Sequence, residues 1–378
     1  MLLEFGANNF YSFEEGFEAS FRLNKHCPED VSQGRETSTV MCVKGANGSG
    51  KTNVLRVLGF LRIFCCDSFA EEPEEELDIL SFFSSKSPSE FYIEFSIGGN
   101  EYRYELTASY EKVYREDLFQ DKTLVVARDG NKFTKINGKF SALKGINLRN
   151  NASFISTANK YEIDEIEDIY TCFKSLYPDI EKTGEMRSMR YQYASDFYKQ
   201  ESSLFDAVKD IMKRLDLGID DISIVKQKDE DEDSEAMYNT VFFHKTSKGG
   251  KKLAYDLASS GTKTLYEALC AFLVNLKYGH ILVVDEFGIN FHPHALPLLV
   301  NLYTNKKTNP SNAQLIFTTH DTAIMDTLGK YRTLMVMKEN NASFAYRLDE
   351  VPGDMLRDDR KISPLYDANK IGGAPIIT

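Results

Sequence analysis

The most specific chemical signal in this sequence is the run Gly45-Ala46-Asn47-Gly48-Ser49-Gly50-Lys51-Thr52. It fits the pattern G-x-x-x-x-G-K-[ST], in which glycines let backbone N–H groups turn inward and wrap phosphate oxygens. In such a loop the lysine reaches the β- and γ-phosphates, and the last hydroxyl binds Mg²⁺. A helix expected over residues 53–64 would direct its positive N-terminal end at the same anion. This phosphate loop therefore predicts ATP and Mg²⁺ as cofactors, with Lys51 in a catalytic role and Thr52 as a metal ligand.

A second signal is Ile281-Leu282-Val283-Val284-Asp285-Glu286, four apolar residues followed by two acids. A buried strand that ends in a carboxylate suits coordination of Mg²⁺ by Asp285. Glu286 would then stand where a general base can polarise an attacking water. Such a run is weak evidence alone, because many strands end in acids. Its combination with the phosphate loop favours ATP hydrolysis, provided that the fold brings the two segments together.

Two further segments could face the same nucleotide. Leu257–Lys263 precedes a helix expected over residues 265–277, and a serine at a helix start either caps the helix or binds an anion. Thr318-Thr319-His320-Asp321 follows a buried strand, and this end of a parallel strand lies on the ligand edge of the sheet. His320 could therefore contact a γ-phosphate. His292 and His294 have no third ligand nearby, so a metal site there is disfavoured.

The composition bounds the class of protein. The 378 residues leave room for about two domains, and 42% of them are apolar. No apolar run reaches the roughly 18–20 residues that span a bilayer, and the N-terminus lacks a secretory pattern, so we expect a cytoplasmic protein without a membrane partner. Six cysteines without CxxC spacing favour reduced thiols. The net charge of −12 disfavours a broad nucleic-acid-coating surface but leaves room for a local basic patch.

Periodicity predicts strands alternating with helices. Strands are expected over residues 2–5, 10–21, 39–44, 90–96, 101–108, 123–128, 153–156, 222–226, 240–244, 281–284, 314–318 and 333–338. Gly98-Gly99-Asn100 predicts a hairpin turn, and Gly279 predicts the end of the helix over 265–277. A further helix is expected over 296–303. The stretch 163–215 is helical and turn-poor, yet too short for a long coiled coil. The late, fully apolar strands indicate an α/β core with a largely parallel sheet.

Taken in order, these motifs resemble the ABC-type ATPase heads of the SMC and RecF superfamily. The opening Asn8–Phe13 is similar to the "ENFRSF" start of those proteins, and GANGSGKTN is similar to their phosphate loop with its trailing Asn53. Finer details resemble the bacterial AAA family-fifteen ATPases, which include RloA, abortive-infection AbiL and PARIS AriA-like proteins of phage defence. The segments that resemble this branch are Ala258–Lys263, Asp285–Pro293, Gln314–Asp321, Arg357–Arg360 with Tyr366, and Gly372–Pro375.

The resemblance implies an α/β P-loop NTPase of ABC/SMC-head type, with a mostly parallel core sheet, an antiparallel β subdomain and a helical insertion. Residues 1–160 would form one ATPase lobe, 161–216 the insertion and 217–378 the second lobe, together one head.

The same resemblance implies how nucleotide and protein chains would assemble. Two heads would pair head to tail in a homodimer or higher homo-oligomer, with each ATP between the phosphate loop of one head and the signature of the other. The implied nucleotide contacts are Asn47, Gly48, Ser49, Gly50, Lys51, Thr52 and Asn53, completed in trans by Ser259, Ser260 and Gly261. His320 would be the switch histidine, and Asn290 would lie in the D-loop. No glutamine stands out where the family's Q-loop should follow the strand expected over 153–156, and Asn159 is only a weak substitute for the second Mg²⁺ contact.

Three functions are compatible with these expectations. The first is an ATPase that serves as sensor and scaffold in an antiviral, abortive-infection type system and controls a separate effector nuclease. The second is a RecF-like ATPase of DNA repair or recombination that acts on nucleic acid directly. The third is a nucleotide-dependent assembly module with little turnover.

Overall fold

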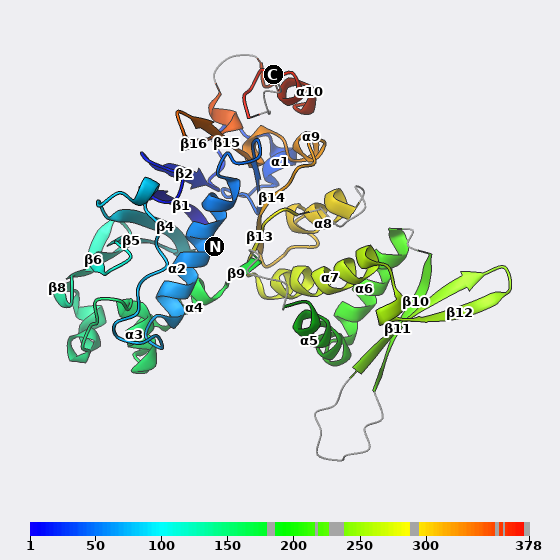
Figure 1. The fold of residues 1–378 in the computed structure, drawn as a ribbon, viewed down its shortest axis with the longest axis horizontal. Helices are drawn as coiled ribbons and strands as arrows, with labels where there is room; N and C mark the ends of the chain where they lie inside the picture. The colour runs from blue at the N-terminus through cyan, green and yellow to red at the C-terminus, as the bar shows by residue number, and fades with distance from the viewer. Residues whose placement is uncertain are drawn as a thin grey trace.

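The computed structural model of this protein describes residues 1–179, 186–215, 218–226, 238–287, 295–351, 355–357 and 360–373. Within these residues a six-stranded core sheet has the order β16-β15-β3-β14-β13-β9 (Figure 1). Its strands are β3 (Val40–Lys44), β9 (Leu176–Asp179), β13 (Ile281–Val284), β14 (Gln314–Thr318), β15 (Thr333–Glu339) and β16 (Ala342–Arg347). All neighbours pair in parallel except β16, which runs antiparallel to β15 at one edge. The carboxyl ends of β3, β14 and β13 therefore meet at one edge of the sheet.

Both faces of the core sheet are covered, which is why its central strands are apolar without alternation. Met41 and Val43 point to the face that packs against α2 (Lys51–Asp67). Val40 and Cys42 point to the opposite face, in the cluster formed with α7 (Ser260–Tyr278) and α8 (Ala295–Thr304). Successive residues of a strand alternate between faces, so one short strand serves both layers. Consequently α2 and α7 lie on opposite faces of the core sheet.

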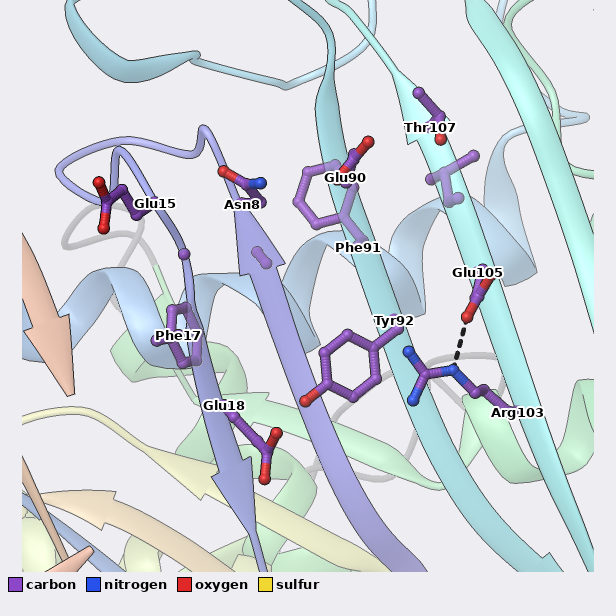
Figure 2. Close-up of a pocket in the computed structure, with 13 residues that line it drawn as sticks. Asn8, Glu15, Phe17, Glu18, Glu90, Phe91, Tyr92, Arg103, Glu105 and Thr107 are labelled. Carbon is purple, nitrogen blue, oxygen red and sulfur yellow. Dashed lines mark hydrogen bonds and ion pairs between the residues drawn. The ribbon is translucent and has the colours of Figure 1, made fainter. Parts of the chain in front are cut away.

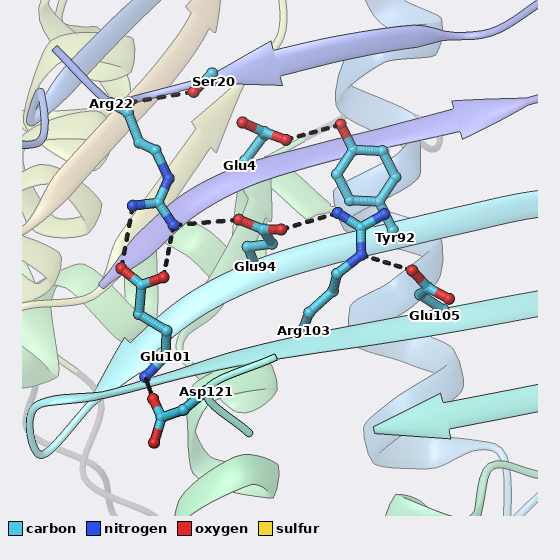
Figure 3. A network of polar contacts seen from close by, with 9 residues as sticks. All are labelled: Glu4, Ser20, Arg22, Tyr92, Glu94, Glu101, Arg103, Glu105 and Asp121. Atoms are coloured by element: carbon cyan, nitrogen blue, oxygen red, sulfur yellow. Dashed lines mark hydrogen bonds and ion pairs between the residues drawn. The ribbon is translucent and has the colours of Figure 1, made fainter. Parts of the chain in front are cut away.

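An antiparallel sheet of order β2-β1-β4-β5-β6-β7-β8 covers the far side of α2. The strands are β1 (Leu2–Asn8), β2 (Phe17–Ser20), β4 (Ser89–Ile97), β5 (Asn100–Ala108), β6 (Val113–Gln120), β7 (Thr123–Asp129) and β8 (Lys132–Ile136). Phe91, Ile93 and Phe95 of β4 alternate into the apolar cluster that contains α2, α3 (Phe154–Lys160) and α4 (Glu167–Lys174). The outer face is polar: Figure 3 shows Arg22 and Arg103 bridging the glutamates of neighbouring strands.

A third region packs on α7. Helices α5 (Met186–Gln200) and α6 (Ser202–Arg214) contact α7, and β10 (Ile219–Lys226), β11 (Tyr238–Thr246) and β12 (Gly249–Ala254) form a three-stranded sheet. The sheet is joined to α7 by a hydrogen bond of 2.9 Å between the hydroxyls of Thr240 and Tyr266. Tyr255, which follows β12, stacks on Tyr191 of α5 with ring centroids 3.8 Å apart. These contacts fix the base of the three-stranded sheet on the helices.

A small apolar cluster packs at the β15–β16 edge of the core sheet. Helices α9 (Ile324–Leu328) and α10 (Ser363–Asp367) share a small apolar cluster with Met335 of β15 and Leu348. Helix α1 (Glu29–Ser32) is a single short turn before the core sheet begins. None of the helices in the described part of the chain combines the length and hydropathy needed to cross a bilayer.

The predicted fold class is confirmed: a mostly parallel core sheet carries an antiparallel β subdomain and inserted helices. Two predicted strands are wrong. Residues 10–21 form one strand only over Phe17–Ser20, because Phe10 and Phe13 bridge each other across a tight turn. Residues 153–156 begin α3, and the Ser153 side chain accepts a hydrogen bond from the Ile155 N–H as the helix N-cap. The predicted division at residues 160 and 216 stays a prediction, and β9, inside that helical segment, is an edge strand of the core sheet.

Candidate nucleotide-binding site

The phosphate loop connects the end of β3, at Lys44, to the start of α2, at Lys51. At two of its glycines, an added Cβ would be too close to neighbouring atoms. A Cβ on Gly45 would stand 2.1 Å from the carbonyl oxygen of Val336 on the neighbouring strand. Gly50 has a φ of +110° and is the N-cap of α2, where a Cβ would lie 2.7 Å from both the Ser12 and Ser343 Oγ atoms. The strand–loop–helix context predicted for this motif is therefore present.

Side chains from distant parts of the sequence hold the loop in place through hydrogen bonds. Ser343 on β16 donates its hydroxyl to the Ser49 carbonyl oxygen at 2.6 Å and contacts the Ser12 hydroxyl at 2.8 Å. The Asn53 side-chain amide donates to the Ser12 Oγ at 2.8 Å, and its oxygen accepts from Arg56 at 3.1 Å. The opening Asn8–Phe13 motif thus contributes a structural support for the loop. The Asn53 side chain is engaged in that support.

The residues present fit a bound polyphosphate. Ser49 Oγ is buried and has no hydrogen-bond partner in the described residues, so it can serve a phosphate oxygen. The Lys51 Nζ donates to the carbonyl oxygens of Gly45 and Ala46, both at 3.0 Å, which holds the ammonium over the loop. Burial lowers the pKa of Lys51, and the carboxylates of Asp285 and Glu286 oppose that shift. A buried ammonium and an unpartnered buried hydroxyl in a strand–loop–helix connection suit a bound triphosphate.

Asp285 and Glu286 follow β13 at the same edge of the core sheet, as predicted. Thr318, at the end of neighbouring β14, donates its hydroxyl to Asp285 Oδ1 at 2.6 Å. The same Oγ1 accepts the Glu286 N–H at 2.7 Å, and the Thr318 carbonyl accepts the Phe287 N–H at 2.7 Å. Glu286 has a left-handed backbone, with a φ of +53°, and its side chain is exposed. Thr318 therefore fixes the acidic pair, while Glu286 projects from a constrained turn.

Lys44 connects the phosphate loop to the segment that carries His320. Its Nζ donates to the carbonyl oxygens of Thr319 and Asp321, both at 2.9 Å, on either side of His320. Lys44 is only 2% exposed, and burial lowers its pKa. The His320 side chain is exposed, so the lysine holds the backbone of this turn and leaves the imidazole accessible. Sequence reasoning missed Lys44; a lysine at the end of an otherwise apolar strand was the available signal.

The predicted signature segment lies on a different layer from the phosphate loop. Ser259 is the N-cap of α7, and its Oγ accepts the Thr262 N–H at 3.1 Å. Ser259 and Ser260 are exposed, and Leu257 beside them is 74% exposed. Because α7 and α2 pack on opposite faces of the core sheet, the helices of the signature and of the phosphate loop belong to separate layers. The N-cap role of Ser259 is compatible with anion binding by the same helix end.

The segment after α10 reaches the base of the phosphate loop. The Tyr366 hydroxyl donates to the Gly373 carbonyl at 2.8 Å, and the Lys44 ammonium lies 5.6 Å from the Tyr366 ring centroid. A Cβ on Gly373 would be 3.7 Å from the Gly45 Cα and 2.3 Å from the Met335 methyl group. The glycines at 372 and 373 therefore allow this segment to pack against the loop.

A separate hollow of about 530 Å³ opens on the outer face of the antiparallel sheet (Figure 2). Its lining includes four glutamates: Glu15, Glu18, Glu90 and Glu105. Arg103 donates to Glu105 within it. Burial, together with neighbouring carboxylates, raises the pKa of Glu18. This acidic lining would repel a triphosphate, so the phosphate loop remains the candidate nucleotide site.

Several residues singled out from the sequence lie outside the described residues or away from the phosphate loop. Asn290, His292 and His294 lie outside the described residues. Asn159 is on α3, and Ser156 of this helix contacts Cys66 and Phe69 at the far end of α2. A helix of 17 residues is about 25 Å long, so Asn159 is not placed to provide the second Mg²⁺ contact. Within the described part of the chain, no group of three or more His, Cys, Asp or Glu residues could hold a metal ion on its own.

Comparison with known proteins identifies the family. Residues 40–326 match the family described as "AAA domain, putative AbiEii toxin, Type IV TA system", and the chain belongs to it. The match runs from β3 to α9, so it includes the phosphate loop, the signature segment, the acidic pair and His320. The protein is therefore an ATPase of the AAA class by family. A search of curated proteins gives no match.

The fold is similar to that of SMC heads. An SMC head bound to the C-winged helix domain of ScpA is 12% identical, with a TM-score of 0.47, covering 91% of this chain and 96% of that one. The SMC head domain from Thermotoga maritima is 14% identical, with a TM-score of 0.46, covering 92% and 98%. An SMC head with an extended coiled coil, bound to the C-terminal domain of ScpA derived from Pyrococcus furiosus, is 11% identical, with a TM-score of 0.45, covering 92% and 97%.

Proposed function

We propose that this protein binds ATP with Mg²⁺ at the phosphate loop and hydrolyses it. The observation that carries the proposal is the meeting of three elements at one sheet edge. Lys51 lies close enough to Asp285 and Glu286 for their charges to oppose the lowering of its pKa by burial. Thr318 lies on β14, between β3 and β13, and its hydrogen bonds fix both acids. This arrangement supports a site in which a polyphosphate, a metal ligand and a general base lie together.

Each residue has a distinct role in this proposal. Lys51 binds the β- and γ-phosphates, while Ser49 and the loop N–H groups bind the remaining oxygens. Thr52 and Asp285 would hold Mg²⁺, which neutralises phosphate charge when bound. Glu286 accepts a proton from the attacking water.

His320, on the turn held by Lys44, donates to the γ-phosphate. This turn follows β14, which separates the phosphate-loop strand from the strand of the acidic pair. The histidine would therefore approach the phosphate from the same sheet edge as Lys51 and Glu286. Its donation would stabilise negative charge that develops on the γ-phosphate during hydrolysis.

The site is composite in this proposal, and a second copy of the chain completes it. The exposure of Ser259 and Ser260, with Gly261 in the first turn of α7, supports contact with a ligand from outside the head. The separation of α7 from α2 by the core sheet supports a partner as the source of the second half. A helix of 19 residues adds the positive end of its dipole to this half site. Nucleotide would then join two heads into a homodimer.

The biological role that we propose is sensor and scaffold in an antiviral, abortive-infection type system. The family description, which names an AbiEii toxin and a type IV toxin–antitoxin system, supports this class of role. In this proposal the effector nuclease is a separate polypeptide. ATP-dependent pairing of heads would hold or release that effector in the cytoplasm.

Hydrolysis is tested with Glu286→Gln, because this change keeps the size of the side chain and removes the base. We expect phosphate release to fall by at least about 100-fold while ATP still binds. Glu339→Gln is the matched control, since Glu339 is an exposed glutamate at the end of β15 in the same sheet. Unchanged low turnover in Glu286→Gln would instead favour the assembly module.

The role is tested separately, by co-purification with the products of adjacent genes in the presence and absence of ATP. We expect a nuclease partner whose retention depends on nucleotide. Neighbouring genes for an unrelated metabolic enzyme would contradict the antiviral role. Turnover that DNA stimulates without any effector would favour the RecF-like alternative.

A further inference from the structure

The turn between β11 and β12 is rich in exposed lysines. Residues 245–252, Lys-Thr-Ser-Lys-Gly-Gly-Lys-Lys, contain four lysines and no acid, in a chain whose net charge is −12. All eight residues are exposed. We call this segment the lysine tip. A surface of this sign on an acidic protein can attract only an anionic partner.

The lysine tip is a two-stranded ribbon. Strand β10 pairs with β11 only as far as Ile219 opposite His244. Beyond that point the pairs are Lys245 with Gly250 and Thr246 with Gly249, so only β11 and β12 continue. Figure 1 shows this end of the three-stranded sheet extending away from α6 and α7. The ribbon is thus open to a large ligand from both sides.

The charges lie on both faces of the ribbon. Lys252 pairs with Phe243, and Lys245 is two residues further along β11, so these two lysines share one face. Lys251 pairs with His244 and therefore points to the other face. Lys248 is in the turn itself. A flat anionic surface would contact only one face, whereas a groove flanked by anions would contact both.

In the described part of the chain, no ion pair involves the four lysines. The nearest carboxylates on the same sheet are Asp220 and Asp221 at the start of β10, and Asp221 lies 3.7 Å from Lys209. Lys252 lies 5.4 Å from the Phe243 ring centroid, which orients its stem without cancelling its charge. Among the described residues, four positive charges therefore remain for a ligand.

We propose that the lysine tip binds the phosphate backbone of duplex DNA. The major groove of B-form DNA admits a two-stranded β-ribbon and has a phosphate chain along each side. The major groove of A-form RNA is too narrow for side chains to enter. Lysines serve as point charges for phosphates without selecting a base sequence, so binding is independent of sequence.

The lysine tip is connected to the signature segment through β12. Strand β12 ends at Ala254, and Ser259, the N-cap of α7, follows only five positions later. Between them Tyr255 stacks on Tyr191, so the connection is packed against helix α5. Strand β12 therefore leads directly from the DNA-binding tip to the segment that carries Ser259.

The test is fluorescence anisotropy of a labelled duplex of about 30 base pairs, titrated with the full chain without ATP at several salt concentrations. Omitting ATP makes the result independent of the proposed hydrolysis. If four phosphates are contacted, affinity falls by about two orders of magnitude between about 50 and 200 mM salt. We expect the variant Lys245→Gln/Lys248→Gln/Lys251→Gln/Lys252→Gln to lose most of this binding and its salt dependence. The single variant Lys248→Gln should lower the slope by about one.

The matched control replaces four exposed lysines of the antiparallel sheet and the turn that follows it, Lys122, Lys132, Lys135 and Lys144, by glutamine, with the same change in net charge. It should bind DNA as the unmodified protein does. Thermal unfolding of each variant reports folding, and the single variant removes only one exposed side chain. Equal affinity and slope in the tip variant and the control would overturn the proposal. Equally tight, tip-dependent binding of duplex RNA would overturn the assignment to the B-form groove.

Discussion

The ammonium group of Lys44 lies 2.9 Å from the carbonyl oxygen of Thr319. An equal hydrogen bond to Asp321 makes this lysine a bridge between the strand that enters the phosphate loop and the turn that presents His320. The Lys44 side chain and its hydrogen bond to Thr319 are buried, so water competes little for that bond. The position of the histidine is therefore linked to the loop that holds the phosphates.

Replacing Lys44 by methionine should uncouple this turn. Methionine fills a similar volume but leaves the two carbonyl oxygens without their donor. We expect kcat to fall by about tenfold, with ATP affinity changed by less than about threefold, because His320 acts on the γ-phosphate after binding. Steady-state turnover and nucleotide binding are measured side by side. Lys307→Met, at an exposed lysine, is the control, and a variant with normal kcat would exclude the positioning role.

The same variant predicts a pH dependence of stability. Burial lowers the pKa of Lys44 below its ordinary value of 10.5, so the unfolded chain binds this proton more tightly than the folded chain does. The contribution of Lys44 to the free energy of unfolding therefore increases as the pH rises from the pKa of Lys44 in the folded chain toward 10.5. Chemical denaturation between neutral and alkaline pH should show this rise in the unmodified protein relative to Lys44→Met. A difference that stays flat or falls would contradict it.

Thr318→Val should disturb the acidic pair without changing the shape of the core. Valine keeps the volume of threonine but cannot donate to Asp285 or accept from Glu286. We expect turnover to fall by about tenfold and the Mg²⁺ concentration for half-maximal activity to rise, since Asp285 loses its orientation. Thr333→Val is the matched control, because that buried hydroxyl on β15 donates to Gly329 instead. An equal effect of both substitutions would assign the loss to stability alone.

Gly50→Ala should abolish nucleotide binding by distorting the phosphate loop. The added Cβ would meet two hydroxyl oxygens at 2.7 Å in a backbone region that alanine rarely adopts. We expect unfolding to become easier by about 1–3 kcal/mol beyond the effect of Gly98→Ala, which has a positive φ but open space around it. Thermal unfolding with and without ATP checks both effects. ATP-dependent stabilisation that persists in Gly50→Ala would refute the loop geometry.

The composite site predicts complementation between two inactive proteins. Lys51→Ala damages the phosphate loop, and Ser259→Arg damages the signature. In an equal mixture, half of the dimers would carry one intact site, so roughly a quarter of normal turnover should return. Mixing Lys51→Ala with Glu286→Gln is the control: both residues serve the same half site, so no turnover should return. Full activity of Ser259→Arg alone would contradict assembly in trans.

The sequence predicted the residues that would bind phosphate and metal better than the residues that hold them in position. Gly45–Thr52 and Asp285-Glu286 carry local signals, because glycines, a lysine and paired acids are needed there for phosphate and metal. The clamp from Thr318 depends on which strands become neighbours, because Thr318 and Asp285 are 33 positions apart and β3 lies much earlier in the chain. Lys44 was missed for the same reason, since its partners lie 275 and 277 positions away.

The missed elements have local causes. Phe154 and Ile155 favour strands by composition, yet the Ser153 cap starts a helix that then packs on α2. Strand β9 has only four residues and includes Pro178, which a central strand could not accept. At the edge of the core sheet, proline costs little because one side of the strand needs no donor. Short edge strands therefore escape detection by periodicity.

Ser12 and Ser343 meet beneath Gly50 although they are 331 positions apart. During synthesis the phosphate loop leaves the ribosome long before β16 does. Until then the loop lacks one of its two hydroxyl supports, and the parallel neighbour β14 that separates it from the acidic pair is also missing. Nucleotide capture would thus be among the last properties that a newly made chain acquires, so a partly synthesised chain could not respond to ATP prematurely.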